Sequence, residues 1–248
     1  MGSDELFVVV MVMTLTVLIA VALVAVLLVL NSNRRVRFDR EAATLETQAL
    51  RSQMNPHFIF NALNSINAYV QQNDTDKATR FLSKFAQVMR GVLENSREAT
   101  VPLADDLRTL KGYMDLERMR AQERFTFTIE VADDLNPEVV MVPPLVVQPF
   151  VENAIWHGLA GVERDGHISL RILQKEGQLL WIVEDNGVGR RQGSTPKAEQ
   201  GKKRSLGTAI TRSRLDLVQK QYGGKAGFHY EDLEQGTRVV VEMPLMVG

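Results

Sequence analysis

The feature that most constrains this chain is a long apolar run near its start. Residues 6–30 carry no charged side chain, and Thr14 and Thr16 are the only polar residues among them. As an α-helix the run would extend about 37 Å, which is long enough to cross a bilayer with some tilt. The sequence therefore predicts a transmembrane helix over residues 6–30, in contact with membrane lipid, after a short tail over residues 1–5.

Charges on the two sides of the run indicate its orientation. Asp4 and Glu5 precede it, and four arginines follow it, at Arg34, Arg35, Arg37 and Arg40. Because short loops rich in Lys and Arg stay in the cytoplasm, we expect a single-pass protein whose C-terminal part is cytoplasmic. A cleaved signal peptide is the alternative. The acidic leader, the length of the run and the lack of a small-residue cleavage site argue against it.

Composition excludes some classes of function. The formal net charge is −1 at pH 7, so there is no globally basic surface and no direct nucleic-acid partner is expected. The chain contains no cysteine, which excludes disulfides and thiolate chemistry. A hydrophobic fraction of 45% and a charged fraction of 24% are typical of a folded protein.

Helical periodicity dominates the chain as far as residue 120. Residues 31–50 fit either a short juxtamembrane coiled coil or a solvated linker helix. The next helix has an apolar stripe, made of Ile59, Leu63, Ile66 and Val70. Another amphipathic helix is expected over residues 76–94, and a third begins near Leu103. Two such helices bury little surface alone. We therefore expect residues 51–120 to pair with a second copy as a four-helix bundle.

The pattern changes after Arg124 to short strands and turns. Strands are predicted over residues 125–131, 167–173, 179–184, 226–230 and 237–242, with helices over 145–158 and 206–221. Residues 187–205 are rich in Gly and Lys and are typical of a loop. Because strands and helices mix without a strict repeat, residues 121–248 are expected to form an α+β domain, with helices on one face of a mixed sheet.

One histidine has an unusual setting, in the segment Gln53-Met54-Asn55-Pro56-His57-Phe58-Ile59-Phe60-Asn61. Pro56 disfavours helical backbone at Asn55, so a helix either starts or kinks here. His57 and Asn61 are one turn apart, on the side of the helix opposite the apolar stripe. A neutral imidazole is nucleophilic near pH 7 and can accept a phosphoryl group. On these residues alone, a phosphoacceptor and an ordinary surface histidine are equally open.

A second polar cluster is Glu152-Asn153-Ala154-Ile155-Trp156-His157-Gly158. Its helix has an apolar stripe at Val147, Val151, Ala154 and Ile155. Asn153 lies away from this stripe, with His157 one turn further on. An Asn amide oxygen is a suitable ligand for Mg²⁺ that phosphates already hold. The plain alternative is an Asn that caps or cross-links.

The third cluster, Asp185-Asn186-Gly187-Val188-Gly189, follows a predicted strand. A carboxylate there can accept a hydrogen bond from the exocyclic amine of adenine, and the glycines Gly187 and Gly189 let backbone approach a ligand. By itself this pattern is more often a turn. Three further candidates for a nucleotide pocket are Lys203 for triphosphate oxygens, Gly207 at a helix start and the Thr237 hydroxyl. For each of these an ordinary surface or turn role is the alternative.

Together the three clusters resemble one family. From about Leu50 to the end, the chain is similar to LytS-type bacterial sensor histidine kinases, with Asn55–Asn61, Gln148–Ile155 and Asp185–Gly189 in the family's order. The resemblance implies a dimerisation and phosphotransfer hairpin, then an α/β-sandwich ATPase domain of the Bergerat type shared with gyrase, Hsp90 and MutL. It also implies ATP, Mg²⁺, a homodimer, the bacterial inner membrane and a response regulator partner, often one with a LytTR DNA-binding domain.

The resemblance also implies roles for individual residues. His57 would be autophosphorylated from ATP and would pass the phosphoryl group to an aspartate of the regulator. The other implied roles are water orientation for dephosphorylation at Asn61, Mg²⁺ binding at Asn153, adenine binding at Asp185, and the nucleotide loop at Gly187 and Gly189. Glu152 is a candidate base for attack by water.

Three features depart from the pattern of histidine kinases. Phe58, as is usual in this subfamily, follows the phosphoacceptor where many histidine kinases have an acidic residue, and Trp156 stands where Lys is frequent. The second glycine-rich box is reduced to Ser205-Leu206-Gly207-Thr208-Ala209-Ile210. These departures keep two alternatives open, a scaffold that binds nucleotide without phosphotransfer and a conformational ATPase.

Overall fold

The computed structural model describes residues 56–162, 165–189 and 211–248. The predicted transmembrane helix, the linker over residues 31–50, and the candidates Lys203 and Gly207 lie outside the described residues. In the part of the chain that the structure describes, no helix is long and apolar enough to cross a membrane.

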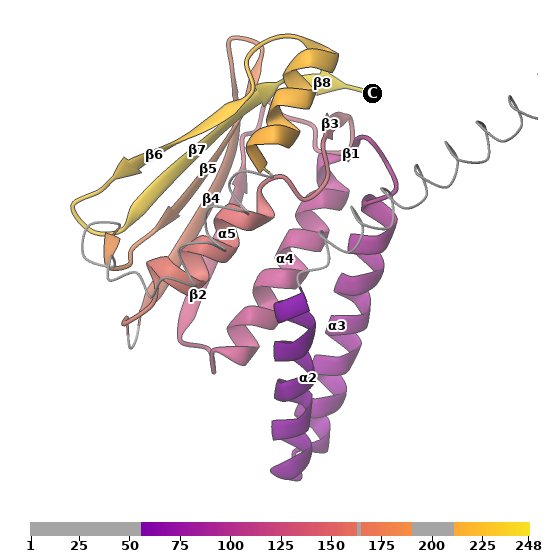
Figure 1. The fold of residues 1–248 in the computed structure, drawn as a ribbon, viewed down its shortest axis with the longest axis vertical. Helices are drawn as coiled ribbons and strands as arrows, with labels where there is room; N and C mark the ends of the chain where they lie inside the picture. Colours follow the sequence, from indigo (N-terminus) through magenta and orange to yellow (C-terminus); the bar gives the residue numbers. More distant parts are fainter. Residues whose placement is uncertain (1–55, 163–164, 190–210) are drawn as a thin grey trace, which may run out of the picture. The chain divides into compact units, whose positions relative to one another are not determined.

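Two long helices form an antiparallel hairpin at the start of the described chain (Figure 1). They are α2, Pro56–Gln71, and α3, Thr75–Asn95. The turn between them uses Asn73 at φ 57°, and Asp74 caps α3 by accepting the backbone N–H of Lys77 at 3.0 Å. The second helix is one residue longer at each end than the predicted range, so the helical pair is confirmed.

The face of α2 that packs inside the hairpin is not the predicted apolar stripe. Phe58 and Ala62 are buried, whereas Leu63 and Val70 are 53% and 59% exposed. The Phe58 ring lies 5.1 Å from the ring of Tyr113 and 5.8 Å from that of Phe85. These ring contacts accompany the burial of the Phe58 side of the helix. Within the predicted stripe, Ile66 packs against the core, whereas Leu63 and Val70 stay at the surface.

Helix α4, Leu103–Arg120, contacts both the hairpin and the sheet that follows. On the hairpin side, the Asn95 side chain donates a buried hydrogen bond of 3.2 Å to the Thr109 hydroxyl. Gly112 lets the two helices approach, since a β-carbon there would lie 2.8 Å from a methyl of Val88. The proposed boundary between residues 120 and 121 stays a prediction, and α4 contacts elements on both sides of it.

A five-stranded sheet in the order β2-β4-β5-β7-β6 forms the second half of the structure. Its strands are β2 Phe125–Val131, β4 Gly166–Lys175, β5 Gln178–Asp185, β6 Gly227–Asp232 and β7 Thr237–Pro244. β2 and β4 are parallel and the other pairs are antiparallel. The mixed sheet was predicted, and each predicted strand lies within two or three residues of an observed one.

Helices cover one face of this sheet (Figure 1). They are α5, Gln148–Asn153, its π-helical continuation η1, Ala154–Gly158, and a helix over residues 211–222. The Phe150 ring packs 4.9 Å from the Phe228 ring, which fixes α5 against β6. The single helix predicted over residues 145–158 therefore begins later and ends in a wider turn.

A small antiparallel sheet was not predicted. It pairs β1, Val101–Pro102, with β3, Val140–Val142, and β3 with β8, Met246–Val247. Strands of two or three residues are too short to produce a readable alternation. This sheet ties the start of α4 to the chain's last residues.

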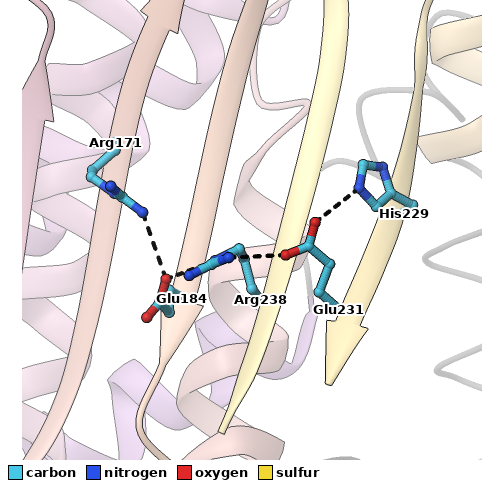
Figure 2. A network of polar contacts seen from close by, with 5 residues as sticks. All are labelled: Arg171, Glu184, His229, Glu231 and Arg238. Atoms are coloured by element: carbon cyan, nitrogen blue, oxygen red, sulfur yellow. Dashed lines mark hydrogen bonds and ion pairs between the residues drawn. The ribbon is translucent and has the colours of Figure 1, made fainter. Parts of the chain in front are cut away.

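The other face of the large sheet carries a row of ion pairs (Figure 2). Arg238 lies at its centre and donates to Glu184 at 2.9 Å and to Glu231 at 3.0 Å. Arg171 lies 3.7 Å from Glu184, and His229 lies 3.3 Å from Glu231. The row crosses β4, β5, β7 and β6. Each partly exposed pair contributes little alone, but together they join four strands on the solvent side.

Candidate nucleotide-binding site

Asp185 is the last residue of β5, and its side chain is buried with 5% exposure. The carboxylate accepts the backbone N–H of Gly187 at 3.0 Å and that of Thr237, its register partner on β7. Burial raises the pKa of Asp185, and the two backbone hydrogen bonds oppose that rise. The result is a fixed acceptor at the end of the central strand.

Glycines pack around this carboxylate. A β-carbon on Gly158 would lie 2.6 Å from the Asp185 carboxyl carbon, and one on Gly236, at φ 90°, would overlap the Asp185 carbonyl oxygen. A β-carbon on Gly187 would overlap the carbonyl oxygen of Gly158, which accepts the N–H of Val188 at 3.0 Å. The backbone that Gly187 admits is therefore the chain's own, at the end of η1.

This packing brings the second and third polar clusters together. Val151, Ala154 and Ile155 are buried, which confirms the predicted apolar stripe of the helix. Asn153 and His157 lie off that stripe and are half-buried. η1 begins directly after Asn153 and ends at Gly158, which lies against Asp185. The π-helical segment therefore connects Asn153 to the residue that packs on the buried carboxylate. Single π-helical turns of this kind are frequent at functional sites.

Glu152 and Trp156 face a different element, helix α4. The Gln148 side chain donates to Glu152 at 3.0 Å. The guanidinium carbon of Arg120 lies 3.6 Å from the centre of the Trp156 ring, a cation–π contact. Arg120 is also paired with the buried carboxylate of Glu117. Burial raises the pKa of Glu117 to about 7, Arg120 opposes the rise and Glu152 adds to it.

His57 and Asn61 lie on a separate element, the first turns of α2. The His57 side chain is outside the described part of the structure. Asn61 is half-buried, and its carbonyl oxygen accepts the Ser65 hydroxyl at 3.0 Å. Continuous helix from Pro56 to Gln71 keeps residues 57 and 61 one turn apart on one face. Whether the helix starts or kinks at Pro56 depends on residues outside the described range.

Gly158 was named as the last residue of the second polar cluster, but its contact with Asp185 was not predicted. The contact of Gly236 with Asp185 and the Arg120–Glu117 pair were missed in the sequence. Gly236 stood out only as the residue before a predicted strand. No local pattern indicates that Arg120 contacts Trp156, since the two residues are far apart in the chain.

The arrangement fits a nucleotide with Mg²⁺. The buried Asp185 carboxylate is an acceptor suited to the edge of a base. Asn153, on the helix whose end packs against Asp185, carries a neutral amide oxygen that could bind Mg²⁺. Among the described residues, no group of three or more His, Asp or Glu side chains could hold a metal ion. A metal at Asn153 would therefore need the phosphate oxygens of the ligand as its main donors.

Two protein families match successive parts of the chain. Residues 45–125 match the family described as Histidine kinase. Residues 144–247 match the family described as Histidine kinase-, DNA gyrase B-, and HSP90-like ATPase. The first match contains the hairpin, and the second contains η1, Asp185 and the last two strands.

Individual sensor proteins are similar to most of this chain. Sensor protein LytS of Staphylococcus haemolyticus is 33% identical over 202 residues, which are 80% of this chain and 34% of that protein. Sensor protein LytS of Bacillus cereus is 30% identical over 207 residues, 82% of this chain and 34% of that protein. The chain thus spans about a third of the length of these relatives. Among solved structures, the histidine kinase domain of a blue-light activated histidine kinase from Erythrobacter litoralis EL346 matches with TM-score 0.47 and 19% identity, covering 83% of this chain and 94% of that one.

Proposed function

We propose, from the premise that this chain belongs to the LytS-type histidine kinases, that it binds ATP in its C-terminal half and phosphorylates its own His57. The observation that carries the proposal is the contact of Gly158 with Asp185. This contact joins the end of the helix that carries Asn153 to the buried carboxylate, which supports a shared role for the two residues in binding one nucleotide. The hairpin helix α2 carries the histidine.

Different residues would bind the base, the metal ion and the phosphates of the nucleotide. Asp185 would accept the adenine amine, beside Gly187, Gly189 and Thr237. Asn153 would hold Mg²⁺, which when bound supplies positive charge to the phosphate oxygens. The phosphate contacts are assigned to His157, Lys203 and the helix start at Gly207.

Phosphoryl transfer would use the imidazole of His57 as nucleophile. The unprotonated ring nitrogen would attack the γ-phosphorus in line as the bond to the bridging oxygen breaks and ADP leaves; the N–H proton of the other ring nitrogen would then be released to solvent. The phosphoryl group would then pass to an aspartate of a response regulator, with Asn61 placed to orient water for its later removal. Glu152 remains a candidate base for attack by water only.

Exposed apolar side chains on the hairpin support a homodimer. Phe60, Leu63 and Val70 on α2 are 68%, 53% and 59% exposed. Leu82 and Leu93 on α3 are 52% and 39% exposed. Pairing these faces across a two-fold axis would bury them in a four-helix bundle.

Membrane attachment and the downstream partner belong to the same proposal. The uncharged run over residues 6–30 supports a single-pass anchor in the bacterial inner membrane, with the kinase part in the cytoplasm. The partner would be a response regulator of the LytTR type, identified by its ability to remove the phosphoryl group from His57.

The test is incubation of the full chain in detergent with γ-labelled ATP and Mg²⁺. We expect acid-labile, alkali-stable label on the wild type and on His229→Gln, a control at an exposed histidine of β6. His57→Gln should bind ATP normally and take no label, and Asp185→Asn should bind weakly. Label of unchanged intensity on His57→Gln would refute this histidine as the acceptor.

The same assay separates the two alternatives. A nucleotide-binding scaffold would bind ATP tightly and form no phosphohistidine, as the Trp156 departure suggests. A conformational ATPase would show steady release of phosphate that survives His57→Gln. Measuring binding, label and free phosphate on one preparation distinguishes the three functions.

A further inference from the structure

A buried carboxylate outside the proposed pocket lies in the first turn of α4. Asp106 is 3% exposed, and its side chain accepts the backbone N–H of Leu145 at 2.8 Å. Leu145 has φ 59°, a left-handed conformation that is uncommon for a branched side chain. This hydrogen bond therefore fixes an unusual backbone conformation in the connection that leads directly into α5.

Arg214 approaches the same point from another element. It belongs to the helix over residues 211–222 and donates a hydrogen bond of 3.0 Å to the carbonyl oxygen of Pro144. Its charge opposes the rise in the pKa of Asp106, and Asp106 in turn opposes the fall in the pKa of Arg214 that burial causes. Thr211 and Leu215 on the same helix are buried, so the helix itself is well anchored.

These contacts join three elements: α4, the connection into α5 and the helix over residues 211–222. The Pro144–Leu145 connection precedes the helix of Asn153 and His157. The helix of Arg214 directly follows residues 190–210, to which the phosphate contacts at Lys203 and Gly207 were assigned. Neither Asp106 nor Arg214 is among the residues assigned to the nucleotide. Asp106 binds the Leu145 N–H and Arg214 binds the Pro144 carbonyl, so the two side chains hold adjacent backbone groups.

We propose that Asp106 and Arg214 are a positioning pair that sets the affinity for Mg·ATP by holding α4 and the helix over residues 211–222 against the connection into α5. The inference rests on the proposed function, because it concerns the same pocket. The pair acts through the backbone of Pro144 and Leu145, without touching the nucleotide.

The energetics of buried charges support this role. Removing one member of such a pair leaves the other charge without a partner, which is more costly than losing an exposed pair. Burial raises the pKa of Asp106 to about 6, opposed by the Leu145 N–H and by Arg214. Among the described residues, Arg214 is the charged group whose field reaches Asp106. Protonation of Asp106 below that pH would remove the charge that faces Arg214.

The test measures the dissociation constant of a fluorescent ATP analogue with Mg²⁺, on the full chain in detergent, between pH 5 and pH 8. We expect Asp106→Asn and Arg214→Gln each to weaken binding about tenfold at pH 7.5, with partial recovery in Arg214→Lys. The double variant should bind no worse than either single one, because both remove one interaction. Wild-type binding should weaken as pH falls through about 6. The change should be smaller in Asp106→Asn, which keeps only the part due to protonation of the nucleotide's own terminal phosphate.

Matched controls lie next to each residue. Asp105→Asn removes an exposed carboxylate paired with Arg108, and Lys220→Gln removes an exposed charge from the same helix as Arg214. Both controls should bind Mg·ATP like the wild type. Thermal unfolding of each variant shows whether it is folded.

Two outcomes would overturn the inference. One is folded Arg214→Gln protein with wild-type affinity, and the other is wild-type binding that does not change between pH 5 and pH 7. The second measurement needs no variant, so it decides the matter even if Asp106→Asn does not fold. A wild type that binds no Mg·ATP at all would instead refute the proposed function, which keeps the two failures separate.

Discussion

Gly158 and Asp185 are in contact, so that a β-carbon on Gly158 would lie 2.6 Å from the carboxyl carbon of Asp185. The contact packs the last residue of η1 against the last residue of β5. It explains why the residue after His157 has no side chain. It also means that the position of the carboxylate depends on the backbone of the neighbouring helix.

Substitution of Gly158 by alanine should therefore disturb the pocket directly. Displacing a packed group to admit a methyl costs about 1–3 kcal/mol, and here the displaced group is the proposed adenine acceptor. We expect Gly158→Ala to weaken binding of a fluorescent ATP analogue by about tenfold or more. Gly227→Ala is the control, because a β-carbon there meets no atom within 4 Å. Equal affinities for the two variants would contradict the prediction.

Charge introduced on the exposed stripe of α2 should prevent dimer formation. A lysine at Leu63, which is 53% exposed, would have to be buried without a partner in a four-helix bundle. We expect Leu63→Lys to shift the chain toward monomer in sedimentation experiments in detergent, with an unchanged unfolding temperature of the protomer. Ala68→Lys adds the same charge on the same helix outside the stripe, and should leave the dimer intact. A dimer of wild-type strength in Leu63→Lys would show that another surface makes it.

The close contact of α3 with α4 should not tolerate a larger residue at Gly91. A β-carbon there would lie 2.7 Å from the Thr109 hydroxyl, which receives the buried hydrogen bond from Asn95. Loss of that bond costs about 1–3 kcal/mol, more than the gain of about 1 kcal/mol from alanine in a helix. Thermal unfolding should show Gly91→Ala less stable than the wild type, and Ser83→Ala, exposed on the same helix, unchanged. A more stable Gly91→Ala would show that the helices can separate without cost.

Burial of Glu117 should make stability depend on pH. Its pKa rises from 4.5 to about 7, so between these values the native state holds a proton that the unfolded chain has lost. The free energy of unfolding should therefore fall as pH rises through this window, by an amount on the order of 3 kcal/mol, since each pKa unit corresponds to about 1.4 kcal/mol.

Denaturant titrations at pH 5 and pH 8 check this prediction. Glu117→Gln should lose most of the difference between the two pH values, because its side chain does not ionise. Glu123→Gln, at an exposed position after α4, is the control and should keep the wild-type difference. A wild type that is more stable at pH 8 than at pH 5 would show the sign to be wrong.

Regular elements were predictable from local pattern. The range of β2 was predicted to the residue, and α3 within one residue at each end, because their apolar periodicities are uninterrupted. The start of α5 was not predictable in the same way. Leu145 adopts a positive φ because Asp106, distant in the sequence, accepts its N–H, and no local signal indicates that partner.

The candidate site shows the same limit. Asp185 and Asn153 were selected by residue type and spacing, and the structure brings their elements together. Their relative position depends on Gly158 and Gly236, because a side chain at either glycine would overlap Asp185. Sequence spacing alone does not show which backbone segments approach so closely. The inward face of α2 was also not predictable, because the choice between Phe58 and Leu63 depends on the rings of Phe85 and Tyr113.

The double contact of α4 has a practical consequence for anyone who divides this chain. The α4 side chains Leu103, Met114 and Leu116 are all at most 1% exposed, and the helix contacts β1, β2 and β3. A fragment that begins at residue 121 would lose α4 and expose the apolar surface that α4 covers, which favours aggregation. A nucleotide-binding fragment suited to crystals or screening should begin before Val101, so that the helix and the short strand β1 travel with it.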